Sequence, residues 1–252
     1  MYKNSGSIII INYYSTGLIN QLESALICLG WEIIVVDNSG DFSSKMDCTI
    51  IINTPVNLGF GRACNLAAEH AKNDVLIFLN PDILMTDAAV IELRKICEEF
   101  PKDTIGGAVL HSPTMAFRTL KRSHTSLLMF ERYQPVLSDC AAVFNVEYVS
   151  GACMFVSQEL WKELGGFDEQ IFMYAEDLDL CQRAKGAGCS IKVYKRLELQ
   201  HLGGKTFNVF GFYGKLRRLI YSLRGHIIFF RKHCKSPICV FLNSIALATG
   251  RF

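Results

Sequence analysis

The sequence predicts an α/β protein built on a mixed, mostly parallel β-sheet flanked by helices. Short β-branched runs alternate with helical segments through the first 110 residues. The runs are apolar throughout, as in parallel strands that helices cover on both faces. A chain of 252 residues with 50% hydrophobic content is also long enough to bury one core of this size.

The first βαβ unit is the clearest part of this pattern. Strands are expected at residues 7–12 and 32–37, with a helix near 19–29 between them. The next segments continue this alternation of strands and helices, which predicts a doubly wound sheet. The further strands are expected at 49–53, 74–79, 105–110, 146–156 and 190–194, and the further helices at 62–71, 88–99, 158–164 and 175–187. Residues 116–140 have no clear pattern and receive no assignment.

Glycine and serine punctuate the later segments. Gly151 interrupts the apolar run 146–156, and a glycine inside a strand often marks the close approach of a ligand or another backbone. Ser157 is placed to cap the following helix, and Gly165 with Gly166 is placed to end it.

Charge is divided sharply along the chain. All 24 acidic residues lie at or before Glu198, so residues 1–198 carry a net −7 and the rest of the chain carries +9. We therefore expect one body over residues 1–205 and a basic helical tail over 206–252. One helical stripe of the tail contains Leu216, Leu219, Ile220, Leu223, Ile227 and Phe230, flanked by Arg217, Arg224 and Arg231. Such a helix is typical of an anionic membrane interface, and a C-terminal helix packed on the body is the alternative.

The cysteines and the hydrophobic runs indicate the compartment. The 10 cysteines are scattered without a CxxC pair, which favours free thiols in a reducing environment. The apolar run at residues 8–11 is too short for a secretory signal, and no run reaches the about 18 to 20 residues that span a bilayer. We expect a cytoplasmic protein associated with the inner face of the cytoplasmic membrane.

Polar residues follow three of the predicted strands. Asn12 and Tyr13 follow the first, Asp37 and Asn38 the second, and the segment 80–82 (Asn-Pro-Asp) follows the strand at 74–79. Ligands of parallel α/β sheets collect at the carboxyl ends of the strands. Each group alone could be a turn that ends its strand, but together they predict a binding site at one edge of the sheet.

Four segments resemble the rhamnosyltransferase-like branch of glycosyltransferase family two. They are VVDNSG at 35–40, NLGFGRACN at 57–65, FLNPD at 78–82 and GGFDEQIFMYAEDLDLCQR at 165–183. The resemblance covers roughly residues 7–205, and the ordered series is far more specific than any one motif. It implies a GT-A fold, with a nucleotide-sugar-binding half at 1–110 and an acceptor-binding, catalytic half at 111–205. It also implies inverting transfer from a nucleotide-sugar donor.

The resemblance also implies which residues bind the donor. Asp82 ends NPD where other members carry DxD, so it is expected to hold a divalent cation, Mg²⁺ or Mn²⁺, with Asn80 in place of the first aspartate. His201, before a Gly-Gly turn, is expected to complete the metal site, and Lys205 could steady the diphosphate. The expected nucleotide-sugar-binding residues are Asn12, Tyr13, Asp37, Asn38, Asn57, Gly59, Asn65 and Asn80. Tyr14 and Arg62 depart from the pattern of the family.

Three acids at the start of the helix at 175–187 are the candidates for acceptor chemistry. An inverting transfer needs one base to take the proton of the acceptor hydroxyl. Asp177 is expected to be that base, with Glu176 binding the acceptor or orienting the base. Asp179 is expected to pair with Arg183, four residues further on. Ordinary capping of the helix is the structural alternative for these acids.

The resemblance implies, as the leading interpretation, transfer of L-rhamnose from a dTDP-sugar, with a UDP-sugar as the other donor class. The acceptor is expected to be a lipid-linked saccharide in bacterial surface polysaccharide assembly, and a homodimer is compatible with the sequence. A non-catalytic saccharide- or lipid-binding partner of a polysaccharide-synthesis complex is the main rival. The lack of GxGxxG after the first strand opposes a dinucleotide oxidoreductase, and the acidic body opposes nucleic-acid binding.

Overall fold

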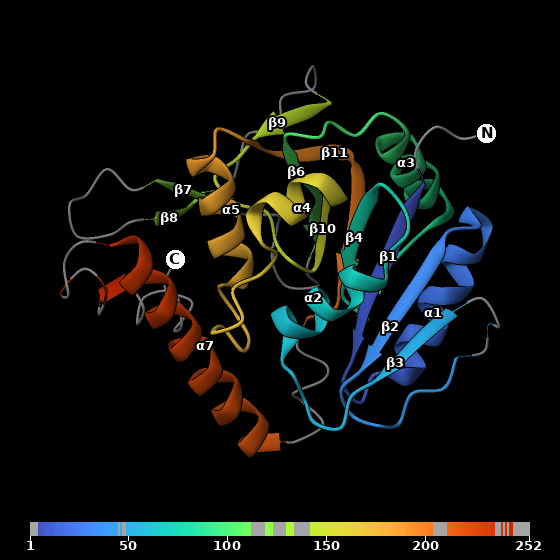
Figure 1. Cartoon of the computed structure of the whole chain (residues 1–252), viewed down its shortest axis with the longest axis horizontal. Helices are drawn as coiled ribbons and strands as arrows, with labels where there is room; N and C mark the ends of the chain where they lie inside the picture. Colours follow the sequence, from blue (N-terminus) through green and yellow to red (C-terminus); the bar gives the residue numbers. More distant parts are fainter. Residues whose placement is uncertain are drawn as a thin grey trace.

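The computed structural model describes residues 5–44, 46, 49–111, 119–122, 130–133, 142–203, 211–234, 238, 240 and 242–243. Its centre is a mixed sheet in the order β3-β2-β1-β4-β10-β6-β11-β5, with β9 paired to β11 (Figure 1). Most of the unassigned region 116–140 and the residue Lys205 lie outside this description.

The elements follow the predicted alternation. The strands are β1 (Gly6–Asn12), β2 (Glu32–Asp37), β3 (Thr49–Asn53), β4 (Val75–Leu79), β5 (Ile83–Leu84), β6 (Thr104–His111), β7 (Thr119–Arg122), β8 (Phe130–Tyr133), β9 (Val143–Asn145), β10 (Cys153–Ser157) and β11 (Ser190–His201). The helices are α1 (Thr16–Leu26), the short 3-10 helix η1 (Ile27–Leu29), α2 (Phe60–His70), α3 (Asp87–Glu98), α4 (Gln158–Leu164), α5 (Glu176–Gly186) and α7 (Gly211–His233). The predicted fold class is therefore confirmed.

Four parallel strands, β1 to β4, form the first half of the sheet. The register pairs Asn12 of β1 with Asp37 of β2, and Asp37 in turn with Asn53 of β3. These three polar residues therefore end their strands at the same level. Burial explains the apolar runs, because every described residue of β1 and β4 is buried.

In the other half of the sheet, the segment expected as one strand at 146–156 is only partly a strand. The expected strand at 146–156 is wrong in its first part, because a turn at residues 150–152 precedes β10 and the Cys153 N–H bonds to the Ser150 carbonyl at 3.2 Å. Strand β10 then runs antiparallel to both β4 and β6. Ser157 caps α4 by accepting from the Leu160 N–H, and Gly165 ends that helix in the left-handed conformation, as predicted.

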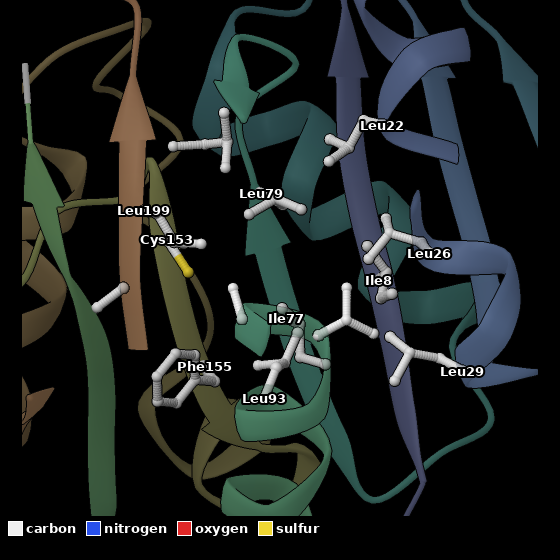
Figure 2. Packing of buried hydrophobic residues seen from close by; sticks show 14 of the residues in the cluster. Ile8, Leu22, Leu26, Leu29, Ile77, Leu79, Leu93, Cys153, Phe155 and Leu199 are labelled. Carbon is white, nitrogen blue, oxygen red and sulfur yellow. The ribbon is translucent and has the colours of Figure 1, made fainter. Parts of the chain in front are cut away.

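Helices cover both faces of the sheet. Apolar side chains of α1 and α3 pack on one face against Ile8, Ile77, Leu79 and Phe155, as Figure 2 shows. The side chains of α2, α4 and α5 pack on the other face, where Phe78 is fully buried. The strands therefore have little freedom, and the site at their ends rests on a rigid base.

Helix α7 packs against α5 at the edge of the body (Figure 1). Its C-terminal part buries Phe229 and Phe230 against Ala175 and Leu178. Its N-terminal half is exposed, including Leu216, which is 44% exposed. The predicted stripe is therefore divided: one end belongs to the core of the protein and the other end faces solvent. No helix of the described ranges is long and apolar enough to cross a membrane.

Charged side chains fasten α7 to the body. The Asp179 carboxylate is fully buried and accepts from Arg183 at 2.7 Å, which confirms the expected pair. Lys232 and His233 of α7 also reach this carboxylate, at 2.9 and 2.8 Å. Burial alone would raise the pKa of Asp179, but its bonds to His233, Arg183 and Lys232 outweigh burial and hold the pKa well below its usual range.

Candidate active site

The polar ends of the strands meet the start of α5 at one edge of the sheet. After β4, the Asn80 N–H bonds to the Ala152 carbonyl at 2.9 Å. The next residue toward the N-terminus, Gly151, donates its N–H to Asp177 at 2.9 Å. The segment after β4, the turn before β10 and the first turn of α5 are therefore in direct contact. The candidate site lies along this edge.

Asp37 organises the loop that follows β2. Its side chain accepts from the Asn12 amide, from the backbone N–H groups of Ser39, Gly40 and Phe42, and from the Ser39 hydroxyl, at 2.8 to 3.1 Å. Burial alone would raise the pKa of Asp37, but these bonds, that from Phe42 first, lower it. Both Asp37 and Asn12 are buried and engaged. They shape the loop around the predicted nucleotide site, and their polar atoms point into the loop.

Asn38 and Gly59 hold the next loop in place. The Asn38 amide donates to the Gly59 carbonyl at 3.0 Å, and its oxygen accepts from the Leu58 N–H at 3.2 Å. Gly59 has a φ of 82°, and a Cβ there would lie 2.2 Å from the Phe172 carbonyl oxygen. Only glycine fits this backbone. Asn57 accepts from the Gly59 N–H at 2.8 Å, so the loop is ordered from within.

Asn65 contacts a different part of the chain. Its amide donates to the Phe167 carbonyl at 3.0 Å and its oxygen accepts from the Phe167 N–H at 2.9 Å. Both hydrogen-bonding ends of the side chain thus hold the turn between α4 and α5. The structure gives Asn65 a role in fixing that turn, although the resemblance assigned it to the donor.

Asp82 and His201 lie side by side where β5 pairs with β11. Residues 83 and 201 are paired in the β5–β11 register, and the Leu202 N–H bonds to the Asp82 carbonyl at 3.0 Å. The His201 Nε2 lies 3.1 Å from the Asp82 Oδ1. The pairing of two strands, distant in sequence, therefore joins the two residues expected to bind a metal.

The Asp82–His201 pair fits a divalent cation. Two ligand atoms that bind one ion at about 2.1 Å and at right angles lie about 3.0 Å apart. The described part of the chain holds no cluster of three or more His, Cys, Asp or Glu side chains suited to a metal. Mg²⁺ is commonly held by one or two protein groups together with substrate phosphates and water. A cation shared with a diphosphate is therefore compatible with these side chains.

A strained turn places the acids at the start of α5. Tyr174 and Ala175 have φ values of 68° and 74°, a region that non-glycine residues rarely occupy. Gly225 of α7 packs on this turn so closely that a Cβ there would lie 2.0 Å from the Tyr174 carbonyl oxygen. Backbone strain of this kind persists where surrounding packing enforces it and is frequent at functional sites.

Asp177 is held firmly in one orientation. Its Oδ2 accepts from the Tyr148 hydroxyl at 2.7 Å and from the Gly151 N–H at 2.9 Å, and its Oδ1 accepts from the Leu178 N–H at 2.8 Å. These three bonds fix the orientation of the carboxylate. Burial raises the pKa of Asp177, and its hydrogen bonds offset only part of this effect.

Glu176 is buried beside Asp177 and has an oxygen without a partner. Its Oε2 is buried and has no hydrogen-bond partner among the described residues. Burial, and next the charge of Asp177, raise the pKa of Glu176 well above its ordinary value. A buried polar atom without a partner costs stability. Simple capping therefore does not explain this acid.

We expect Glu176→Gln to stabilise the fold at neutral pH by about 1 kcal/mol, since the neutral amide avoids the cost of burying a charge beside Asp177. A carboxyl whose pKa is raised in the folded state destabilises the fold at pH values above that pKa. At pH values below the pKa of the unfolded state this destabilisation is absent. The gain should thus disappear below about pH 4. Thermal unfolding at both pH values tests this, and an equal change at both would contradict it.

One pocket of the structure was missed by the sequence analysis. It is lined by Tyr13, Asn57, Phe172, Met173, Gly214, Arg217 and Tyr221. Tyr13 and Asn57 were expected to bind the donor, but three of the lining residues belong to α7, which was interpreted as a separate tail. Tyr148, the hydroxyl donor to Asp177, was also missed. Gly151 lies in a turn and not in a strand, and the atoms nearest to a Cβ placed there belong to the side chains of Phe60 and Asp177 and not to another backbone.

Comparisons with known proteins identify the family of the chain. Residues 7–165 match the family described as Glycosyl transferase family 2. The low-salt glycan biosynthesis hexosyltransferase Agl10 of Haloferax volcanii is 25% identical over 194 residues, which cover 73% of this chain and 63% of Agl10. The rhamnosyltransferase WbbL of Escherichia coli K12 is 28% identical over 213 residues, which cover 70% of this chain and 76% of WbbL. The chain thus spans less than two thirds of the length of Agl10.

The fold has solved counterparts. The mannosyltransferase PcManGT of Pyrobaculum calidifontis, in complex with GDP-Man and Mn²⁺, superposes with a TM-score of 0.61 at 14% identity, covering 98% of this chain and 70% of that one. The architecture is therefore the GT-A fold. Because the family match covers more than half of the chain, the protein belongs to glycosyl transferase family 2, and its resemblance to the rhamnosyltransferase-like branch is confirmed.

Proposed function

We propose that this protein is an inverting, cation-dependent glycosyltransferase that uses a nucleotide-sugar donor. The observation that carries the proposal is the contact between Asp82 and His201, on a segment that bonds through Asn80 to the turn at residues 150–152, which also donates to Asp177. The Asp82–His201 pair has the chemistry to hold a cation, and Asp177 is a base with a raised pKa. The family match supports the same reaction class.

The residues divide the work of the transfer. Asp82 and His201 would hold the cation, which would supply charge stabilisation to the departing nucleoside diphosphate. Asp177, oriented by Tyr148 and Gly151, takes the proton of the acceptor hydroxyl. Burial and the neighbouring Asp177 keep the pKa of the Tyr148 hydroxyl high, so it remains a hydrogen-bond donor. Glu176, buried beside Asp177, binds the acceptor or orients the base.

The substrates are proposed from the relatives. We propose L-rhamnose from dTDP-rhamnose as donor, because WbbL is named a rhamnosyltransferase. An N-acetylglucosaminyl-diphospho-decaprenol L-rhamnosyltransferase of Mycobacterium tuberculosis is 26% identical over 62% of this chain. That name supports a lipid-linked saccharide as acceptor. The exposed apolar and basic N-terminal half of α7 would suit contact with an anionic membrane on the cytoplasmic side, where such an acceptor resides.

A thermal-shift screen of dTDP- and UDP-sugars, with and without Mn²⁺ or Mg²⁺, tests the donor and the cation together. We expect a nucleotide-sugar to raise the melting temperature in the presence of the cation and much less in EDTA, since ligands stabilise by mass action. dTDP-rhamnose should give the largest shift. Equal shifts with unrelated nucleotides such as ATP, or no cation dependence with any sugar nucleotide, would contradict the proposal.

A further inference from the structure

Helix α7 forms a wall of the pocket that contains Tyr13 and Asn57. Gly214, Arg217 and Tyr221 of α7 line the pocket opposite these two residues. The Tyr221 ring packs on the Phe172 ring with centroids 4.7 Å apart. The Phe172 carbonyl in turn accepts from the Phe60 N–H at 2.9 Å, next to Gly59. The helix therefore docks directly onto the loops that shape the donor site.

The docking of α7 is tight and built from small residues at the contact. Gly214 and Gly225 of α7 are both buried. Gly214 lines the pocket, and a Cβ at Gly225 would meet the backbone of residues 173 and 174. At the far end of the helix, Asp179 holds Lys232 and His233. Gly225, Lys232 and His233 thus anchor the part of α7 that follows Arg217 to the body of the protein.

Arg217 carries a positive charge that no acid of the described residues neutralises. Its guanidinium donates to the Tyr221 hydroxyl at 3.0 Å and lies 5.8 Å from the centre of that ring. The ion pairs found among the described residues do not include it. An arginine placed beside aromatic rings and left without a carboxylate is well suited to phosphate oxygens, which it can bind through two parallel hydrogen bonds.

We propose that α7 is part of the donor site and that Arg217 binds the diphosphate of the nucleotide-sugar. The rings of Tyr13, Phe172 and Tyr221 then supply an apolar wall for the nucleoside, and Asn57 supplies a polar contact. This inference rests on the proposed function, since it assigns a ligand to a wall of the same site. It also gives the C-terminal helix a role in binding that is independent of any membrane contact.

Isothermal titration calorimetry of the full chain with dTDP and with thymidine, both in Mg²⁺, tests this proposal. We expect Arg217→Ala to weaken dTDP binding by about tenfold or more and thymidine binding by about twofold or less, because charge-assisted bonds form only with the phosphates. Arg217→Lys should be intermediate. Arg224→Ala is the matched control: it removes an equal charge from an exposed position of α7 outside the pocket. Circular dichroism confirms that each variant is folded.

The outcomes separate this inference from the proposed function. Wild-type affinity of Arg217→Ala for dTDP, with binding lost in Asp82→Ala, would overturn the role of Arg217 and leave the proposed function standing. Equal weakening by Arg217→Ala and Arg224→Ala would show a general charge effect and would also overturn it. Absence of dTDP and UDP binding by the wild-type protein would overturn both proposals.

Discussion

Asp177→Asn is expected to abolish sugar transfer while the donor still binds. The amide cannot take the proton of the acceptor hydroxyl, and loss of a general base typically costs about 10²- to 10⁴-fold in rate. The Tyr148 hydroxyl and the Gly151 N–H can still donate to the amide oxygen, and only the bond from the Leu178 N–H is lost, because the amide nitrogen takes the place of Oδ1. Initial rates of transfer, measured beside donor affinity by calorimetry, check this expectation.

The comparison variant for Asp177→Asn is Glu176→Gln, which changes the neighbouring acid in the same way. We expect it to lower transfer less and to raise the KM of the acceptor or donor, because Glu176 is assigned to binding the acceptor or orienting the base. A full loss with Glu176→Gln and near-normal rates with Asp177→Asn would exchange the two roles. Full activity of both variants would remove this acid pair from the mechanism.

The pH dependence of transfer follows from the raised pKa of Asp177. A base must be ionised to act, so the rate should fall as pH decreases through that pKa. Because burial raises the pKa, the fall should begin at a higher pH than for an exposed aspartate. The acidic limb should be missing from the residual activity of Asp177→Asn.

Asp82→Ala is expected to remove the cation-dependent part of donor binding. The substitution leaves His201 without the carboxylate that lies 3.1 Å from it, and one imidazole is a poor site for Mg²⁺ or Mn²⁺. Donor affinity of the variant in Mn²⁺ should therefore fall to the value that the wild-type protein shows in EDTA. His201→Ala should show a smaller loss of the same kind. Affinity that responds to EDTA equally in the wild type and in Asp82→Ala would contradict the metal assignment.

The sequence predicted the parallel half of the sheet closely, for a physical reason. Strands β2 (Glu32–Asp37) and β3 (Thr49–Asn53) have the expected bounds, and β4 is buried throughout, so its composition is uniform. The short strands β5 and β9 were not predicted. Each is only two or three residues long and forms by pairing with β11. The local sequence of so short a strand does not show that such a partner is present.

The residues of the candidate site stay a prediction, but one of their contacts can be compared with the structure. The motif series named Asp82 and Asp177, the resemblance added His201, and the structure brings Asp82 and His201 into contact. Residue types alone do not reveal where a side chain points, so the inward-facing bonds of Asp37 and Asn65 could not be foreseen. The role of α7 was hidden for another reason: its docking depends on glycines that match the shape of a distant turn. The division of the chain into a body at 1–205 and a tail at 206–252 stays a prediction.

The most direct test of the account is the anomeric configuration of the product, determined by NMR after incubation of the protein with dTDP-rhamnose, Mn²⁺ and a lipid-linked saccharide acceptor. The account predicts a product of inverted configuration that forms with the wild-type protein and is absent with Asp177→Asn and with EDTA. A product of retained configuration, or one that forms equally well without Asp177, would contradict a single displacement assisted by this base.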